Sequence, residues 1–352
     1  MRIIQGLNLL KNALRRKPPF GFIGLAKSAV DYYREPAAVS GSPLFLQIEP
    51  TILCNLECAY CINPTLSRDR TSLSFEKFKH ILSEVPLINK ISLVGIGESF
   101  MNKDLWRIIR YAKSSGLEIG TTTNATILNA RLLDEIFSSG LDWLNFSIDG
   151  ATKKTYEAMR PGANFEDVIA NIHRIVSAAG KRANPRLAVW FLSNSNNISE
   201  LPDMVPLVKE LGITELHTQG VHYWGHPDWY QGAQEANNIP SLRDHLKKTR
   251  DAADALDVSF QWVNFPDEKA PRSCKWPWKG AYITADGHVT PCCENGSDPK
   301  RITFGNIFDK SFSDIWNSHN YRTFRRELRE KGTRPAICKD CPSYNKPITL
   351  EP

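Results

Sequence analysis

The sequence contains no run of eighteen apolar residues, so no membrane-spanning helix is expected. Its start, from Met1 to Gly6, lacks the apolar core and the small-residue cleavage site of a signal peptide. Eight cysteines occur without an export signal, which favours reduced, metal-binding thiols over disulfides. Together these absences predict a cytoplasmic protein.

The chain also lacks a basic, aromatic-rich face through its central part, which a protein that reads nucleic acid would usually carry. The net charge of +6 is concentrated in residues 1–35 and 300–334, and the rest of the chain is acidic overall. Nucleic acid is therefore not expected as a partner. The 352 residues, 41% of them apolar, are enough for one large globular domain and a smaller one.

Residues 1–42 stand apart from the rest of the chain. Apolar residues recur at helical spacing between Ile3 and Leu14, basic residues follow, and Pro18-Pro19 ends the predicted helix. A basic amphipathic helix can lie on an anionic membrane surface. Docking on the main domain is favoured here, because most amphipathic helices face a protein core.

From residue 43 to about 235, strand and helix patterns alternate. The expected strands are Leu44–Ile48, Ile91–Val94, Leu117–Thr121, Trp143–Ile148, Arg186–Leu192 and Thr214–Thr218. The helical patterns between them are Phe75–Glu84, Asp104–Ser114, Ala130–Ser138, Phe165–Ala179 and Leu201–Leu211. This alternation predicts an α/β fold whose parallel strands form a partial (β/α)6 TIM-like barrel. In barrels the chemistry occurs at the carboxyl ends of the strands.

Three cysteines at C-x3-C-x2-C spacing, Cys54, Cys58 and Cys61, directly follow the first expected strand. Thiolates bind soft metals and iron–sulfur clusters, and a [4Fe–4S] cube needs four ligands. Three cysteines therefore leave one iron open, as catalytic metal sites do. Zinc is the alternative, but no histidine lies within fifteen residues of this loop to complete a zinc site.

Polar groups follow the next three strands. Gly97 and Glu98 stand in a glycine turn after the second strand, Asn124 follows the third, and Ser147 and Arg160 follow the fourth. Each alone is ordinary turn chemistry. Their order after successive strands places them at the same edge of the predicted sheet.

The cysteine loop, with Tyr60 just before its last cysteine, resembles the signature of the radical S-adenosylmethionine (radical SAM) superfamily. In that family the open iron chelates the amine and carboxylate of SAM, and one electron cleaves SAM to methionine and a 5'-deoxyadenosyl radical. The family's Gly-Gly-Glu-Pro motif is only partly kept, because Ile96 and Ser99 replace its first glycine and its proline. The resemblance implies a SAM site made of Tyr60, Gly97, Glu98, Asn124, Ser147 and Arg160.

The remaining cysteines lie in residues 236–352. A hairpin is predicted around Asp286-Gly287, and a helix is predicted over Phe312–Leu328. Four thiols flank these elements and could close an all-cysteine cube or a structural zinc site: Cys274, Cys292, Cys338 and Cys341.

The Gly-x4-Cys and Cys-x2-Cys spacings resemble the auxiliary-cluster region of the SPASM/twitch branch of radical SAM proteins. No cysteine follows Cys341, so the resemblance implies one auxiliary [4Fe–4S] cluster, as in the shortened twitch form. Cys293 is left over. It can replace Cys292 as a ligand, be inert, or donate a hydrogen atom to a substrate radical.

The sixth strand leads into a segment rich in histidine and aromatic residues. His217, Gln219, His222 and Tyr223 are candidates for a substrate wall, because His can move protons near neutral pH and aromatic faces stack on rings. A packed connection to the next domain fits the same residues equally well.

The resemblance therefore implies three parts: a basic N-terminal helical segment (1–42), a radical SAM partial barrel (43–235) and an auxiliary [4Fe–4S] cluster domain (236–352). The function that it favours is an oxidoreductase. The radical takes hydrogen from a small sugar-, aminocyclitol- or nucleoside-like substrate, the auxiliary cluster accepts an electron, and a flavodoxin- or ferredoxin-like protein is the external reductant.

Three other functions stay open. One is a radical SAM epimerase with Cys293 as its hydrogen donor. Another is a maturase that modifies a ribosomal peptide, which ranks lower because residues 1–42 are too short for a peptide-binding module. The third is a metal-stabilised binding or electron-transfer protein, which would not cleave SAM.

Overall fold

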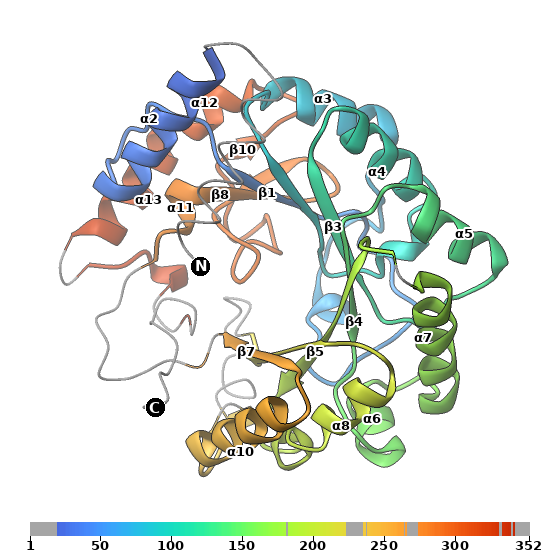
Figure 1. Ribbon diagram of the computed structural model, residues 1–352. Coiled ribbons are helices and arrows are strands. Elements are labelled where there is room, and N and C mark those ends of the chain that lie inside the picture. The colour runs from blue at the N-terminus through green and yellow to red at the C-terminus, as the bar shows by residue number, and fades with distance from the viewer. Residues whose placement is uncertain are drawn as a thin grey trace.

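The computed structural model describes residues 20–180, 182–222, 235–236, 238–263, 265, 274–330, 333–338 and 341. The helix expected before Pro18 and the candidate Tyr223 lie outside these residues. Within these residues, ten strands form the central sheet (Figure 1). They are β1 (Phe45–Ile48), β2 (Lys90–Leu93), β3 (Glu118–Thr123), β4 (Trp143–Ser147), β5 (Arg186–Ser193), β6 (Glu215–Gly220), β7 (Ser259–Val263), β8 (Gly280–Ile283), β9 (His288–Thr290) and β10 (Gly305–Asn306).

The sheet has the linear order β10-β9-β8-β1-β2-β3-β4-β5-β6-β7. Strands β1 to β7 pair in parallel with their sequence neighbours. Strand β8 pairs in parallel with the other side of β1, and β9 and β10 then continue antiparallel. The predicted α/β fold with an open partial barrel is confirmed, and so is the predicted hairpin, formed by β8 and β9.

Helices connect the parallel strands and lie around the outside of the curved sheet (Figure 1). They are α3 (Phe75–Glu84), α4 (Leu105–Ser114), α5 (Ala130–Ser138), α6 (Lys153–Met159), α7 (Phe165–Ala179), α8 (Met204–Glu210) and α10 (Leu242–Ala255). Several begin at a side chain that accepts a hydrogen bond from a backbone N–H of the first turn, among them Ser74, Asn129, Thr152 and Asn164. Short 3-10 turns occur at Asn63–Thr65, Ser99–Met101, Ile198–Glu200 and Ala336–Cys338.

The two faces of the curved sheet differ in polarity. Leu46 and Ile48 of β1, and Leu144 and Phe146 of β4, are fully buried in the main apolar core. The strand residues between them, Gln47 in β1 and Asn145 in β4, are polar and point to the opposite face, because side chains alternate along a strand. The barrel therefore has an apolar outside under the helices, and its inside carries polar side chains together with the rings of Trp143 and Trp190.

Strand β7 and the C-terminal helices are two of the differences from the sequence-based expectation. Strand β7 is a seventh parallel strand, paired with β6 beyond the predicted barrel boundary at residue 235. The single helix expected over Phe312–Leu328 is two helices, α12 (Phe312–Trp316) and α13 (His319–Arg329). The break occurs because Ser318 caps α13 by accepting a hydrogen bond from the Tyr321 N–H.

Residues 20–42 pack on the C-terminal part of the chain. Helix α2 (Phe20–Arg34) lies beside α11 (Trp276–Lys279) and near α12 and α13 (Figure 1). The Trp278 indole N–H donates to the Pro36 carbonyl at 2.8 Å, and the Asn317 amide bonds both backbone groups of Val39 at 2.9 and 3.0 Å. Among the described residues, no helix is long and apolar enough to cross a bilayer.

Candidate active site

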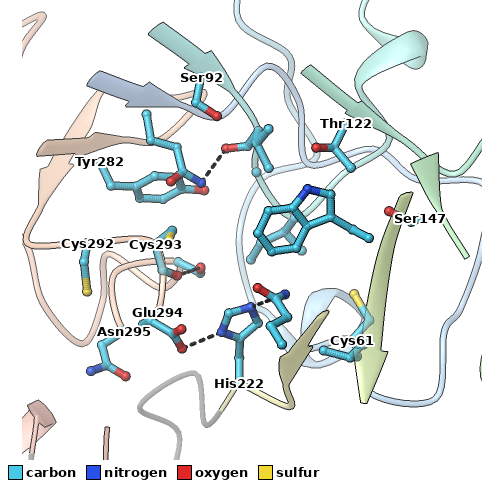
Figure 2. Close-up of a pocket in the computed structure, with 18 of the residues that line it drawn as sticks. Cys61, Ser92, Thr122, Ser147, His222, Tyr282, Cys292, Cys293, Glu294 and Asn295 are labelled. Carbon is cyan, nitrogen blue, oxygen red and sulfur yellow. Dashed lines mark hydrogen bonds and ion pairs between the residues drawn. The ribbon is translucent and has the colours of Figure 1, made fainter. Parts of the chain in front are cut away.

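A cavity of about 930 Å³ lies at the carboxyl ends of the parallel strands. Both groups of cysteines line it, those that follow β1 and those of the C-terminal part. Figure 2 shows Cys61 on one side of the pocket and Cys292 and Cys293 on the other. The strands thus bring together two sets of cysteines that are more than two hundred residues apart in the sequence.

The first cysteine loop is closed at its base. Thr51 and Ser72 form an isolated bridge there, with their hydroxyl oxygens 2.7 Å apart. The turn after β2 packs against this base, because the Gly97 N–H donates to the Thr51 carbonyl and the Glu98 N–H donates to the Leu53 carbonyl. A Cβ atom on Gly97 would lie 2.3 Å from the Thr51 oxygen, so only glycine fits there.

The thiols of Cys54, Cys58 and Cys61 lie close enough together to affect one another's ionisation. Burial raises the pKa of all three, that of Cys61 to about 12. Arg160 opposes this shift at Cys58, since its Nη1 lies 3.8 Å from the Cys58 sulfur. Thiols buried in this way stay protonated until a metal displaces the proton, so the loop fits a soft metal group better than a reactive free cysteine.

Glu98 is buried, and its carboxylate joins the turn after β2 to the end of β3. One carboxylate oxygen accepts hydrogen bonds from the Phe100 N–H at 3.0 Å and the Thr123 hydroxyl at 2.7 Å. The other accepts from the Asn124 N–H at 2.7 Å. The Asn124 side chain in turn donates to Asn55 of the cysteine loop at 3.1 Å. Burial raises the pKa of Glu98, and these donors oppose the rise.

Arg160 forms an ion pair with Asp149 at the end of β4. The guanidinium Nη2 lies 2.7 Å from the Asp149 carboxylate, and both side chains are largely buried. The structure thus places Glu98, Asn124 and Arg160 in the lining of one pocket with the cysteines, together with Tyr60, Gly97 and Ser147. Asp149 was not singled out from the sequence, because its importance depends on the distant Arg160.

The four C-terminal cysteines, Cys274, Cys292, Cys338 and Cys341, line this same pocket. Cys274, Cys338 and Cys341 all lie close enough to Cys292 to raise its pKa, although burial is the largest cause. Burial raises the pKa of Cys274 to about 11 and that of Cys338 to about 12. As in the first loop, this donor set is suited to a metal group that replaces the protons.

A buried ion pair connects the first cysteine loop to the C-terminal hairpin. Arg68 follows the loop, and its Nη1 lies 2.9 Å from the Glu49 carboxylate and donates to the Ser297 carbonyl at 2.8 Å. Its Nη2 lies 3.2 Å from Asp286 in the β8–β9 turn. The side chains of Arg68 and Glu49 are 3% and 0% exposed, so this pair is part of the interior.

Uncharged polar side chains line part of the inner wall of the barrel, beside the rings of Trp143 and Trp190. Each comes from an inward-facing strand position, and Figure 2 shows three of them, Ser92, Thr122 and Ser147, around the pocket. Gln47 of β1 also belongs to this wall, where its amide donates to the Val94 carbonyl at 3.0 Å. Amides and hydroxyls can both donate and accept, so the wall suits a polar ligand.

The predicted substrate residues separate into two groups. His217 stacks on Trp190 with the ring centres 5.0 Å apart and is not among the residues that line the pocket. Gln219 and His222 do line it, and His222 Nδ1 lies 2.5 Å from Glu294 of the C-terminal part. Burial acts to lower the pKa of His222, but the charge and hydrogen bond of Glu294 together raise it.

Cys293 lines the pocket between the barrel wall and the second thiol group. Figure 2 shows it near Tyr282 and next to Cys292, on the side of the C-terminal part. Burial raises the pKa of its thiol to about 12, and the Gln47 side chain opposes the rise. Cys293 is therefore a protonated thiol at neutral pH that faces the same space as both thiol groups.

Two family models match the chain. That of the radical SAM superfamily matches residues 48–215, and that of an iron–sulfur cluster-binding (SPASM) domain matches residues 274–342. The second match favours iron–sulfur over zinc for the C-terminal thiols.

Curated relatives and solved structures are similar over most of the chain. The AdoMet-dependent heme synthase of Methanosarcina barkeri is 26% identical over 86% of this chain and 90% of its own length. The PqqA peptide cyclase of Gluconobacter oxydans is 26% identical over 85% of this chain and 82% of its own. Streptococcus suis SuiB, solved with the precursor peptide SuiA, has a TM-score of 0.68 at 15% identity, covering 91% of this chain and 78% of that one.

Proposed function

The chain belongs to the radical SAM superfamily and carries a SPASM domain, and from this we propose that it is a radical SAM enzyme that modifies a peptide. Two [4Fe–4S] clusters and SAM are its cofactors. Together they supply a radical that takes a hydrogen atom from an unactivated C–H bond. We assign the SAM-binding cluster to Cys54, Cys58 and Cys61, and the auxiliary cluster to Cys274, Cys292, Cys338 and Cys341.

We propose that the side chains around the first cluster site hold SAM. Arg160 presents a guanidinium that suits a carboxylate, with Asp149 fixing its orientation at 2.7 Å. Glu98 holds the turn after β2 and the backbone of Asn124 in one arrangement, and its carboxylate attracts an ammonium group. Tyr60 is held by the Asn196 amide, which donates to its hydroxyl at 3.0 Å.

The peptide proposal is supported by the polar side chains that line the pocket between the two sets of cysteines. Amides and hydroxyls of Gln47, Ser92, Thr122 and Asn145 line a cavity of about 930 Å³, and such groups pair with peptide N–H and C=O groups. Several relatives are PqqA peptide cyclases, and their activity supports the same substrate class. A peptide therefore replaces the sugar- or aminocyclitol-like molecule that the sequence analysis put first. A flavodoxin- or ferredoxin-like reductant and a cytoplasmic location remain predictions.

The test uses anaerobically reconstituted enzyme with SAM and dithionite. Synthetic peptides encoded by short reading frames beside the gene are added one at a time, and a panel of sugars and aminocyclitols serves as the comparison. We expect one peptide to raise the release of 5'-deoxyadenosine and to lose the mass of two hydrogen atoms. Stimulation by an aminocyclitol and by none of the peptides would overturn the peptide proposal.

Cys293 supports a second candidate, an epimerase that returns a hydrogen atom to the substrate radical. Its protonated thiol lines the same pocket as both thiol groups. In this reaction SAM is consumed while the substrate keeps its mass. Incubation in D2O separates the two candidates, because an epimerase would place one deuterium on the peptide and the Cys293→Ser variant would not.

A further inference from the structure

The turn that follows Cys292 folds back toward the C-terminal cysteines. The Gly296 N–H donates to the Cys292 carbonyl at 3.0 Å, and the Ser297 hydroxyl donates to the Cys293 carbonyl at 3.0 Å. A Cβ atom on Gly296 would lie 2.4 Å from the Cys292 carbonyl oxygen, so only glycine fits this close turn. The turn places Asn295 in the pocket lining, and Figure 2 shows it on the same side of the pocket as Cys292.

Asn295 carries a buried donor without an ordinary acceptor. The residue is 2% exposed, and among the described residues no oxygen or nitrogen atom accepts a hydrogen bond from its Nδ2. Burial raises the pKa of Cys338 to about 12, and a hydrogen bond from the Asn295 side chain opposes that rise. The amide is therefore a donor that faces a sulfur atom of the C-terminal cysteines.

Tyr321 of α13 carries a second donor of this kind. The residue is fully buried, and its hydroxyl has no hydrogen-bond partner among the described residues. The ring stacks on Phe304 with the centres 3.9 Å apart, and Arg325 Cζ lies 4.0 Å from the ring centre, so the ring is held in one position. Burial raises the pKa of Tyr321, and the nearby Cys292 and Cys274 add to the rise.

Two unpaired donors beside four cysteines point to an acceptor at the cysteine site. An unpaired polar group in the interior costs free energy, so proteins nearly always pair it with a protein group, a water molecule or a bound group. Hydrogen bonds to the sulfur atoms of a [4Fe–4S] cluster are among the factors that set its reduction potential. An added electron makes these sulfur atoms more negative, so a donor stabilises the reduced form more than the oxidised form.

We propose that the Asn295 amide and the Tyr321 hydroxyl donate hydrogen bonds to sulfur atoms at the auxiliary cluster site and thereby raise the reduction potential there. The raised potential favours the reduced form, as an electron acceptor requires. This inference rests on the cluster ligands assigned under the proposed function, and it does not depend on the identity of the substrate.

The test is a redox titration of the reconstituted full-length protein, followed by electron paramagnetic resonance. The variant without the three cysteines of the first loop identifies the signal of the auxiliary site. Asn295→Leu and Tyr321→Phe each remove one donor and nearly keep the shape of the side chain. We expect each to lower the ratio of reduced to oxidised auxiliary cluster, at a fixed applied potential, by about tenfold. This is the lower end for a hydrogen bond to a charged group and equals about 59 mV for one electron.

Two buried groups elsewhere in the chain provide matched controls. Asn89 is 8% exposed and Tyr156 is fully buried, and the amide nitrogen of the one and the hydroxyl of the other have no hydrogen-bond partner among the described residues. Neither residue lines the pocket. Asn89→Leu and Tyr156→Phe should therefore leave the potential of the auxiliary site unchanged. An equal shift in these controls would overturn the proposal, because it would come from a general loosening of the interior.

Iron is measured on every sample, and Asn295→Ala replaces Asn295→Leu if the larger side chain lowers the iron content. An unchanged auxiliary potential in the Asn295 and Tyr321 variants, with about eight irons per chain retained, would overturn the proposal. The titration needs no peptide. Failure of every peptide to stimulate SAM cleavage would therefore count against the proposed function alone, and the measured potentials would still decide the assignment of the two donors.

Discussion

Replacing Glu98 by Gln should weaken SAM binding without removing the clusters. The carboxylate accepts three hydrogen bonds, from the Phe100 N–H and the Thr123 hydroxyl on one oxygen and from the Asn124 N–H on the other. A glutamine side chain can keep the first two on its carbonyl oxygen. Its NH2 group must then face the Asn124 N–H, so one hydrogen bond to a charged group is lost and two donors oppose each other.

The size of the effect follows from that single bond. A hydrogen bond to a charged group contributes about 1.5–3 kcal/mol, which corresponds to a change of about 10- to 100-fold in an equilibrium constant. The change reaches the SAM site because Asn124 also donates to Asn55 in the cysteine loop. We therefore expect the Kd for SAM to rise by about 10- to 100-fold.

The assay is anaerobic calorimetry of SAM binding to cluster-loaded protein, with iron content measured on the same samples. Glu84→Gln is the matched control, because its carboxylate also accepts from a backbone N–H, that of Phe312 at 2.9 Å, but is not among the residues that line the pocket. Unchanged SAM affinity in Glu98→Gln would refute the reasoning. Loss of iron with loss of binding would instead place Glu98 in cluster assembly.

Three further predictions concern the clusters and the buried ion pair. Changing Cys54, Cys58 and Cys61 to Ala should lower the iron content from about eight to about four per chain, and a fall to none would mean that the C-terminal cysteines hold no cluster. Arg68→Met should lower the free energy of unfolding, measured in urea, by about 3–5 kcal/mol, because it leaves Glu49 buried without its cation. Adding Glu49→Gln to Arg68→Met should restore most of this loss. An equal loss in the single and the double variant would contradict the argument. Because burial raises the pKa of Glu49 to about 6, the folded state binds its proton more tightly than the unfolded state. The contribution of Glu49 to the free energy of unfolding is therefore most favourable below its ordinary pKa of 4.5. This contribution should fall by about 2 kcal/mol as the pH rises through about 6, and Glu49→Gln should abolish that fall.

The sequence predicted the features that depend on local pattern. The repeated strand–helix units and the β8–β9 hairpin could be read from apolar periodicity and from turn residues such as Asp286-Gly287. Strand β7 was not predicted, although Ser259–Val263 begins with alternating polar and aromatic side chains, as a half-buried strand does. The polar alternation around Gln47 and Asn145 was also visible and would have indicated polar side chains inside the barrel.

The missed site features depend on contacts between distant residues. Glu294 and His222 are 2.5 Å apart in space but lie in different halves of the chain, and nothing local marks Glu294 as part of a site. His217 and Gln219 share one face of β6, so periodicity could not tell that only Gln219 lines the pocket. The position of a side chain along the barrel axis depends on the register between neighbouring strands, and a single sequence does not reveal that register.

The pairing of β8 with β1 has a consequence for how this protein can be divided. Four residue pairs, from Phe45 with Gly280 to Ile48 with Ile283, make β1 an interior strand of the sheet. A chain shortened after residue 263 would leave β1 as an open edge, with Leu46 and Ile48 next to unpaired backbone groups, and such edges promote aggregation. The C-terminal part is therefore not a detachable module, and transplanting either half into another protein would require a replacement strand beside β1.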